Sequence, residues 1–335
     1  MQNHQVHTPL QSSQPLVSFI ITCYNLPIQM LCECIDSILA LSLTTEEREV
    51  IVVDDGSNTS PMNGLMQYGE EIVYIRQKNA GVSVARNAGM QIAKGKYIQI
   101  VDGDDALIKI PYEPCLDIIR TAPDTDAVLF DFTRDTNYQS SSSNFLRPKP
   151  VNGSWLLRNS NLHGAVWCCL FRQAVRSQLS FTPGICYAED EEFMPQLLLR
   201  AEVVYATNVK AYYYRQRTTS VVHMADDASI TKRLDDTHAV ISHLQKMADR
   251  LPSTDRLALQ RRVAQLTMDY LYNTIVLTRS RKTLETRIAA LRTEGLFPLP
   301  DRNYSAKYIW FRRLSQSKTG RTLLFYAIQH LRRER

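Results

Sequence analysis

The sequence lacks the features that mark membrane-spanning and secreted proteins. No apolar run among its 335 residues approaches the roughly 18 residues of a membrane-spanning helix, so any membrane contact is expected to be peripheral. Residues 1–14 are polar and contain no apolar signal-peptide core. These absences favour a cytoplasmic location.

The chain also lacks the common phosphate-binding loops. It contains neither the G-x-x-x-x-G-K-S/T motif nor the G-x-G-x-x-G motif. The phosphates of a bound nucleotide would therefore have to be met in another way, and a metal ion held by carboxylates would do so. The net charge of +5 is mild and no nucleic-acid recognition motif is present, so no nucleic-acid partner is expected.

The seven cysteines do not have the spacing of a zinc site. Cys32 and Cys34 are separated by one residue, and Cys168 and Cys169 are adjacent. In a reducing compartment, cysteines stay free and behave as small apolar residues. We therefore expect free and mostly buried thiols.

Between residues 15 and 225, short apolar runs alternate with segments of helical periodicity. We expect strands at residues 17–24, 49–53, 72–76, 97–101 and 127–132, and two short strands within 202–214. We expect helices at residues 28–41, 82–94, 106–120 and 187–200. This alternation predicts an α/β fold whose mostly parallel sheet is covered by helices on both faces.

Three regions differ in composition. Residues 1–14 are expected to form a flexible N-terminal tail, residues 15–225 the α/β domain, and residues 226–335 a C-terminal helical region. Within the last region, residues 302–335 combine many basic residues with aromatic and apolar ones. This pattern suits a basic amphipathic helix on an anionic membrane surface. It suits equally a helix that packs on its own domain with a solvated basic face.

Polar clusters directly follow three of the expected strands, at residues 22–25, 54–57 and 102–105. In open sheets of parallel strands, ligands bind beside the carboxyl ends of the strands. We therefore expect the three clusters to lie together at one edge of the sheet and to form a site.

The acidic turn after residues 97–101 is the most informative of these clusters. Asp102 and Asp104 are two residues apart, so on extended backbone they project to the same side. Two carboxylates on one side, in a turn loosened by Gly103, suit a hard divalent cation such as Mg²⁺ or Mn²⁺. The alternative is a strand-to-helix turn in which Asp104 or Asp105 caps the next helix.

Other residues near the expected edge are candidate nucleotide contacts. Asp55 could accept an N–H from the edge of a uracil or guanine base, or it could stabilise an Asp-Gly turn. Thr22 and Tyr24 could frame a base, Tyr24 by stacking, or they could pack at the end of their strand. Arg86 could contact a base or a phosphate, or it could pair with a surface carboxylate.

Four consecutive acidic residues, 189–192, open the helix expected at residues 187–200. Acidic residues in a first turn complement the helix dipole, but four of them exceed what that requires. Their mutual repulsion could raise the pKa of one of them toward that of a working base. Glu189 and Asp190 are therefore candidates for a general base that deprotonates a hydroxyl.

Two ring-bearing side chains carry weaker signals. His223 could be a third metal ligand or a phosphate contact, although a lone histidine after a strand is more often a loop residue. Trp167 could be a platform for a sugar ring, although a tryptophan in an apolar segment is more often part of the core.

The order of these motifs closely resembles that of family 2 glycosyltransferases over about residues 15–222. The segments that carry the resemblance are residues 17–25 (VSFIITCYN), 52–57 (VVDDGS), 79–87 (NAGVSVARN), 94–97 (KGKY), 101–105 (VDGDD) and 189–193 (EDEEF). Each segment alone is weak, whereas the ordered set is specific. Within the family, the chain is similar to members of the bacterial surface-polysaccharide type.

The resemblance implies a GT-A fold, a nucleotide-sugar donor (commonly a UDP-sugar), a divalent metal (Mn²⁺ or Mg²⁺) and inversion at the anomeric carbon. By the match, the nucleoside would be bound by Thr22, Tyr24, Asp55 and Arg86. The Asp-x-Asp motif for the metal and the diphosphate would be Asp102 and Asp104, and the catalytic base would be Asp190. His223 lies where some members place a metal or diphosphate contact.

Two departures from the family pattern are visible. Many members have Asp-Ser-Asp-Asp where this chain has Gly103, a change that should not affect the metal. Many members have Trp-Asn-Lys where this chain has Trp167 followed by Cys168 and Cys169. The resemblance therefore predicts the donor side of the site and leaves the acceptor contacts open.

These patterns predict a metal-dependent, inverting, hexosyltransferase-like enzyme. It would move a sugar from a nucleotide-sugar to a hydroxyl of a glycan or lipid-linked acceptor in surface polysaccharide synthesis, on the cytoplasmic face of a membrane. A catalytically silent nucleotide- or carbohydrate-binding module and a metal-dependent nucleotidyltransferase remain as alternatives. The sequence predicts no oligomeric state.

Overall fold

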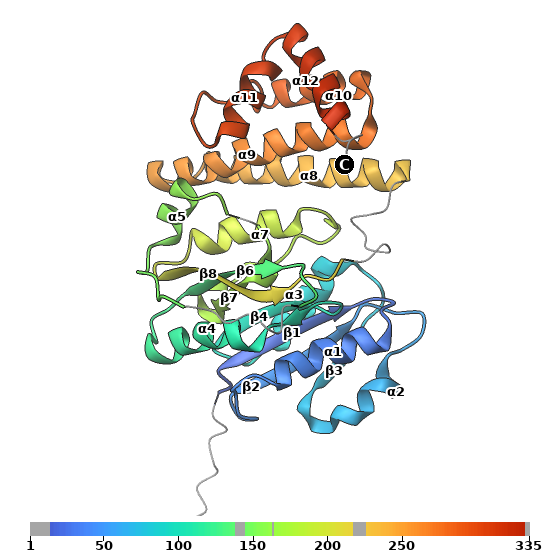
Figure 1. Ribbon diagram of the computed structural model, residues 1–335, viewed down its shortest axis with the longest axis vertical. Coiled ribbons are helices and arrows are strands. Elements are labelled where there is room, and N and C mark those ends of the chain that lie inside the picture. Colours follow the sequence, from blue (N-terminus) through green and yellow to red (C-terminus); the bar gives the residue numbers. More distant parts are fainter. Residues whose placement is uncertain (1–13, 138–144, 163, 217–225, 332–335) are drawn as a thin grey trace, which may run out of the picture.

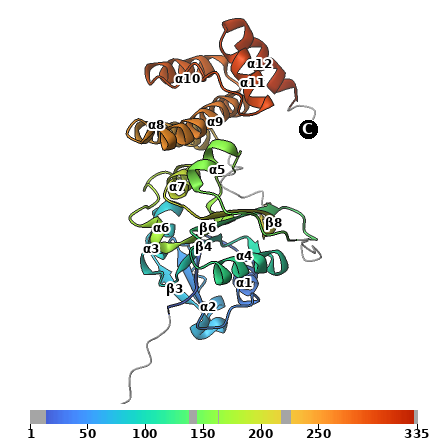
Figure 2. The same ribbon diagram turned by 90° about the vertical axis from the view of Figure 1, so that its left-hand side faces the viewer.

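A computed structural model describes residues 14–137, 145–162, 164–216 and 226–331. The molecule is built in tiers. A sheet with helices on both faces forms one end, two long helices cross over it, and three shorter helices form the other end (Figure 1). Figure 2 shows the same tiers from the side.

The central sheet has the strand order β3-β2-β1-β4-β7-β6-β8-β5. Its strands are β1 (Val17–Cys23), β2 (Arg48–Asp54), β3 (Val73–Arg76), β4 (Tyr97–Asp102), β5 (Ala106–Leu107), β6 (Ala127–Thr133), β7 (Cys169–Arg172) and β8 (Val204–Tyr213). Strands β3, β2, β1 and β4 are mutually parallel, and β6 is parallel to β8. The predicted mostly parallel sheet is confirmed.

Two details of the sheet differ from the prediction. Strand β7 lies antiparallel between β4 and β6, within a segment that the sequence marked only as apolar. The two short strands expected within residues 202–214 are a single strand, β8. Its register against β6 shifts on either side of Asp131, and this irregularity lets one strand follow β6 along its whole length.

The helices beside the sheet cover both of its faces. They are α1 (Ile28–Leu39), α2 (Met62–Leu65), the 3₁₀ helix η1 (Met66–Glu71), α3 (Val82–Ile92), α4 (Lys109–Thr121), α5 (Gly153–Asn159), the 3₁₀ helix η3 (Val166–Cys168), α6 (Gln173–Arg176) and α7 (Glu189–Leu198). Helices α1 and α4 pack on one face, and α3, α5 and α7 pack on the other. This arrangement follows from the strand sequences, because all seven residues of β1 are buried.

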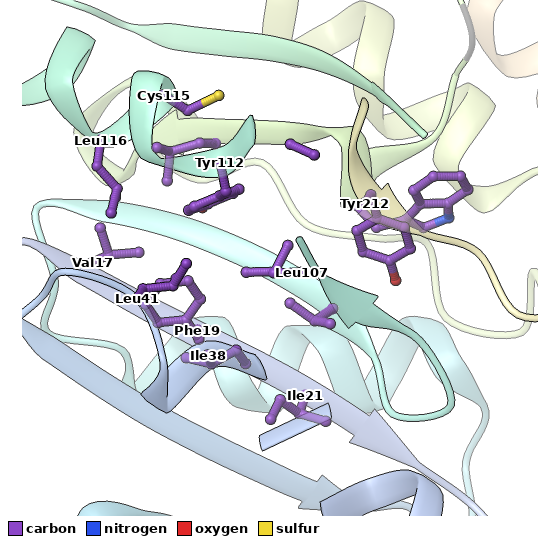
Figure 3. Close-up of a cluster of buried hydrophobic side chains, with 14 of the residues drawn as sticks. Val17, Phe19, Ile21, Ile38, Leu41, Leu107, Tyr112, Cys115, Leu116 and Tyr212 are labelled. Carbon is purple, nitrogen blue, oxygen red and sulfur yellow. The ribbon is translucent and has the colours of Figure 1, made fainter. Parts of the chain in front are cut away.

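Alternate residues of β1 supply the two apolar layers. Val17, Phe19 and Ile21 face α1 and α4, where Tyr112 and Leu116 meet them (Figure 3). Burial of each such side chain stabilises the fold by roughly 1.5–3 kcal/mol. Burial in these layers determines which residues of β1 face each side of the sheet. It therefore also determines the direction of the polar residues that follow the strand.

The C-terminal helices form a further apolar cluster of their own. They are α8 (Asp227–Ala248), α9 (Ser253–Thr278), α10 (Arg281–Thr293), α11 (Ala306–Ser315) and α12 (Lys318–Leu331). Helix α7 contacts α8, and α5 contacts α9, so the long pair of helices lies over the α/β part (Figures 1 and 2). The proposed boundary near residue 225 falls outside the described residues.

Helices α11 and α12 have a packed face and an exposed face. Their inner side chains are buried, among them Tyr308 and Phe325. Trp310, Leu323 and Tyr326 are 64%, 60% and 60% exposed. Packing on the domain therefore accounts for the buried apolar side chains of the two helices. Membrane contact through the exposed ones stays a prediction. No helix in the described ranges is long and apolar enough to cross a membrane.

The prediction for the cysteines is confirmed. All seven thiols are free, and five of them are buried, Cys32 being partly exposed and Cys186 exposed. Burial raises the pKa of the Cys23 thiol to about 12. These thiols act as apolar filling beside the sheet.

Candidate active site

The three polar clusters that follow β1, β2 and β4 lie together at one edge of the sheet. In the register of the sheet, Cys23 pairs with Asp54, and Thr22 pairs with Asp102. The edge opens into a cavity of about 930 Å³. The cavity is lined by all the residues predicted to contact the donor: Thr22, Tyr24, Asp55, Arg86, Asp102 and Asp104. The predicted convergence is confirmed.

Asp55 has its carboxylate bound by the chain that leads into α3. Its oxygens accept hydrogen bonds from the Gln77 side chain (2.7 Å) and from the backbone N–H groups of Ala80 (2.9 Å) and Gly81 (2.8 Å). An ionised carboxylate has about four acceptor positions, so Asp55 retains capacity for one further donor. The carboxylate fixes the loop before α3 and still faces the cavity.

Thr22 and Tyr24 lie at different depths of the same cavity. Thr22 is buried at the end of β1, whereas the Tyr24 side chain is 49% exposed. An exposed ring at the rim of a cavity presents its face to a planar ligand. Tyr24 is therefore positioned for stacking, while Thr22 forms part of the floor.

Arg86 lies in the interior and holds three carboxylates. Its Nη1 donates to Glu189 (2.9 Å) and Asp190 (2.7 Å), and its Nη2 donates to Asp102 (2.9 Å). Burial alone would lower the pKa of Arg86, but the three carboxylates raise it above its usual range. The suggested pairing with a surface carboxylate is wrong, because the partners are candidate site residues and the Arg86 side chain is only 3% exposed.

The four acidic residues at the start of α7 point to two different places. Glu189 and Asp190 face Arg86, whereas Glu191 pairs with Arg262 of α9 and Glu192 lies 2.8 Å from the His243 ring of α8. Two of the acids therefore belong to the site, and two attach α7 to the C-terminal helices. This division explains why the run is longer than a helix dipole requires.

Asp190, the predicted base, is held through both of its carboxylate oxygens. Its Oδ1 accepts from Arg86, and its Oδ2 accepts from the backbone N–H of Val166 (3.2 Å). Burial raises the pKa of Asp190 to about 8, against the lowering effect of Arg86 and with help from Glu189 and Asp102. Burial also raises the pKa of Glu189. A buried carboxyl with a pKa near neutrality is suited to proton transfer.

The acidic turn after β4 contains two kinds of aspartate. Asp105 is buried and accepts from the Tyr212 hydroxyl (2.9 Å) and the Arg215 backbone N–H (2.8 Å), as a structural residue would. Asp102 and Asp104 line the cavity. Gly103 is required by a close approach, since a Cβ there would lie 2.8 Å from the Thr22 carbonyl oxygen.

The carboxylates fit a divalent cation only together with a ligand. Within the described ranges, no group of three or more His, Cys, Asp or Glu side chains could hold a metal alone. Mg²⁺ and similar ions are commonly bound by one or two carboxylates, with substrate phosphates completing the shell. Asp102 and Asp104 match that donor set. His223, predicted as a third ligand, lies outside the described residues.

A second cavity of about 370 Å³ adjoins the first. Both cavities are lined by Arg86, Asp102, Glu189, Glu191 and Tyr214, and Asp190 lines the second. The remaining walls are largely aromatic. For Trp167, the sequence allowed either a platform for a sugar ring or a place in the core. The residue is only 9% exposed but lines this cavity, and its ring stacks on that of Tyr214 with 5.4 Å between the ring centres.

Several residues that line the cavities were missed in the sequence. Phe132 and Arg134, at and just after the end of β6, line the second cavity, and their place at a strand end is a signal that could have found them. Arg233 of α8 and Asn273 of α9 line the large cavity. The latter two carry no motif, because their only relation to the site is the packing of α8 and α9 over it.

Comparisons with known proteins agree with this fold. Residues 18–179 match the family model for glycosyl transferase family 2. The uncharacterized glycosyltransferase EpsJ of Bacillus subtilis is 29% identical over 228 residues, which are 63% of this chain and 64% of EpsJ. The chain thus spans less than two thirds of that relative's length.

Solved structures show the same architecture at low identity. The structure of S. aureus TarS 1–349 in complex with UDP-GlcNAc has a TM-score of 0.64 and 16% identity, covering 95% of this chain and 92% of that one. The mannosyltransferase PcManGT of Pyrobaculum calidifontis, in complex with GDP-Man and Mn²⁺, has a TM-score of 0.55 and 16% identity, covering 94% and 85%. With its matching motifs and the GT-A fold, the segment 18–179 of the chain is a domain of glycosyl transferase family 2.

Proposed function

We propose that the protein transfers a sugar from a nucleotide-sugar donor to a hydroxyl group, with inversion at the anomeric carbon. The observation that carries this proposal is that two cavities share Arg86, Asp102 and Glu189, with Asp190 in the wall of the smaller one. The larger cavity contains the residues predicted to bind the donor, and the smaller one combines charged side chains with the rings of Phe132, Trp167 and Tyr214. A donor and an acceptor would then approach each other across the candidate base.

The donor would occupy the large cavity. Its nucleoside would lie against Thr22, Tyr24 and Asp55, and its diphosphate would lie near Asp102 and Asp104. A UDP-sugar is the donor that we propose. The solved structures with UDP-GlcNAc and with GDP-Man support a nucleotide-sugar in general.

A divalent ion, Mn²⁺ or Mg²⁺, would be held by Asp102 and Asp104. When bound, it would neutralise the charge of the leaving diphosphate. The chain itself contributes the fixed charge of Arg86, which lies 2.9 Å from Asp102 and holds that carboxylate toward the cavity from behind.

Asp190 would act as the general base. The acceptor oxygen would form a bond to the anomeric carbon while the bond from that carbon to the diphosphate oxygen breaks. The hydroxyl proton would pass to Asp190, and attack opposite the leaving group would invert the configuration. The raised pKa of Asp190 makes its carboxylate a stronger base than an ordinary aspartate.

The acceptor that we propose is a glycan or lipid-linked hydroxyl in surface polysaccharide synthesis, on the cytoplasmic face of a membrane. The exposed side chains of Trp310, Leu323 and Tyr326 support this part. Two basic residues of the same helices, Arg313 of α11 and Lys318 of α12, are also exposed. Aromatic and basic side chains on one surface favour an anionic lipid headgroup layer.

Donor hydrolysis tests the reaction without knowledge of the acceptor, because water can replace the hydroxyl. The protein would be incubated with several labelled nucleotide-sugars, with Mn²⁺ and with EDTA, and the products separated. We expect free sugar and nucleoside diphosphate from one donor, and none in EDTA. Full turnover in EDTA would refute the role of the metal, and release of sugar 1-phosphate and nucleoside monophosphate would indicate nucleotidyl transfer.

A variant of the base completes the test. Asp190→Asn should abolish hydrolysis while binding of UDP, measured by calorimetry, stays within about threefold of that of the wild type. The exposed Asp117 of α4 provides the control, since Asp117→Asn changes a carboxylate remote from both cavities. A catalytically silent module would bind the nucleotide and release no sugar in either form.

A further inference from the structure

We propose that the smaller cavity binds an acceptor sugar that carries an anionic group, and that Arg134 recognises that group. The proposal rests on the proposed glycosyl transfer, because it concerns the second substrate of the same site. The anion is a carboxylate or a phosphate, since both present the paired oxygens that a guanidinium binds with two hydrogen bonds.

Arg134 is held at the wall of the smaller cavity. It comes directly after β6 and lines the smaller cavity together with Phe132, Trp167 and Tyr214. Its guanidinium carbon lies 5.4 Å from the centre of the Phe132 ring and 5.4 Å from that of Tyr214. Contacts with two ring faces hold the guanidinium at the wall of the cavity.

Charged side chains of both signs line the smaller cavity. Four carboxylates line it, and each has an arginine partner: Asp102, Glu189 and Asp190 bind Arg86, and Glu191 binds Arg262. In the part of the chain that the structure describes, Arg134 makes no ion pair. Arg86 is shared by three of these carboxylates, and none of the four pairs with Arg134, so the Arg134 guanidinium is the cation of this cavity that is left to bind an anion of a ligand.

Aromatic rings form part of the wall of the smaller cavity. Trp167 stacks between Tyr212 (4.5 Å between ring centres, 25° between planes) and Tyr214 (5.4 Å, 20°). The Tyr212 hydroxyl donates to Asp105 and accepts from the Asp102 backbone N–H, which fixes this stack to the acidic turn. A fixed set of rings offers apolar surface to the C–H groups of a sugar.

Two residues of the cavity wall would then have different roles. Asp190 would take the proton of the reacting hydroxyl. Arg134, which lies over the rings of Phe132 and Tyr214, would bind a negative substituent of the same sugar or of its neighbour. The volume of about 370 Å³ is at the small end of the range for small-molecule sites, so it fits a monosaccharide unit.

Three matched probes test the proposal by calorimetry with the full chain in the presence of UDP and Mn²⁺. They are methyl β-glucoside, which is neutral, methyl β-glucuronide, which carries a carboxylate, and methyl β-glucoside 6-phosphate. We expect at least one anionic probe to bind at least tenfold more tightly than the neutral one. The stronger of the two identifies the anion.

Variants of Arg134 test whether this side chain causes the preference for the anionic probe. Arg134→Gln should remove the preference for the anionic probe, and Arg134→Lys should keep part of it. Arg147→Gln is the matched control, because Arg147 is also exposed and lies over a tyrosine ring, that of Tyr205 at 4.9 Å, but lines neither cavity. It should leave the preference unchanged.

Three results would overturn the proposal: equal binding of neutral and anionic probes, a preference that survives Arg134→Gln, or binding of none of the probes at millimolar concentration. None of these touches the proposed function, which donor hydrolysis by the wild type decides separately. A protein that hydrolyses its donor and shows no anion preference refutes the acceptor chemistry alone.

Discussion

Replacement of Asp190 by asparagine should stabilise the fold, and the gain should grow with pH. Asp190 has a side chain that is 16% exposed, and burial raises its pKa to about 8. In the unfolded chain an aspartate titrates near pH 3.9. Between these two values the folded state holds the proton that the unfolded state has released, so the wild type loses stability as pH rises.

The size of the effect follows from the same pKa difference. Each pH unit inside the window costs the wild type up to about 1.4 kcal/mol, so the advantage of Asp190→Asn should widen by up to about 2.7 kcal/mol between pH 5.5 and 7.5. Arg86 keeps a partner in the variant, because the asparagine Oδ1 can accept its hydrogen bond. In a chain of this size the difference amounts to a few degrees in Tm.

Thermal unfolding of both proteins at pH 5.5, 6.5 and 7.5, without donor or metal, measures the effect. Asp117→Asn controls for the removal of a carboxylate from the exposed face of α4. A difference in Tm between wild type and Asp190→Asn that does not change with pH would refute the reasoning. So would a change that Asp117→Asn reproduces.

Two further changes test other parts of the structure. Arg86→Met leaves three carboxylates without their buried cation and should cost about 3–5 kcal/mol at pH 8. The loss should be smaller at pH 5, because burial raises the pKa of Glu189 and of Asp190 and these two take up protons. An equal loss in thermal melts at both pH values would contradict this. Replacing Trp310 and Leu323 by serine should abolish flotation with vesicles that contain anionic lipid, whereas Trp155→Ser on α5, which removes a 45% exposed side chain, should not. Flotation of the double variant at the wild-type level would remove these helices as a membrane contact.

The donor edge of the site could be predicted from the sequence because local signals and topology agree there. Apolar runs mark β1, β2 and β4, and the rule that their carboxyl ends share an edge brings Asp55 and Asp102 together. Strand β7 could not be assigned in this way. Its four residues lie in an apolar segment too short to indicate direction, and its antiparallel pairing depends on β4 and β6.

The partners of Arg86 were beyond local reasoning. Glu189 and Asp190 lie more than 100 positions away along the chain, and only the packing of α7 on the sheet brings them to the guanidinium. The same holds for Arg233 and Asn273, whose role in lining the large cavity depends on how α8 and α9 cross the edge. Side chains at strand ends or in a recognisable motif are predictable, whereas Arg233 and Asn273, which α8 and α9 supply without a motif, are not.

The division of the acidic run in α7 has a consequence for engineering. One turn of helix carries the proposed base, Asp190, together with two anchors to the C-terminal helices, Glu191 to Arg262 and Glu192 to His243. The C-terminal helices are thus a fixed counterpart of the reaction centre and not an exchangeable attachment. A chimaera that takes helices α8 to α12 from a relative must bring matching partners for both anchors, or the helix that presents Asp190 will lose its alignment with Arg86.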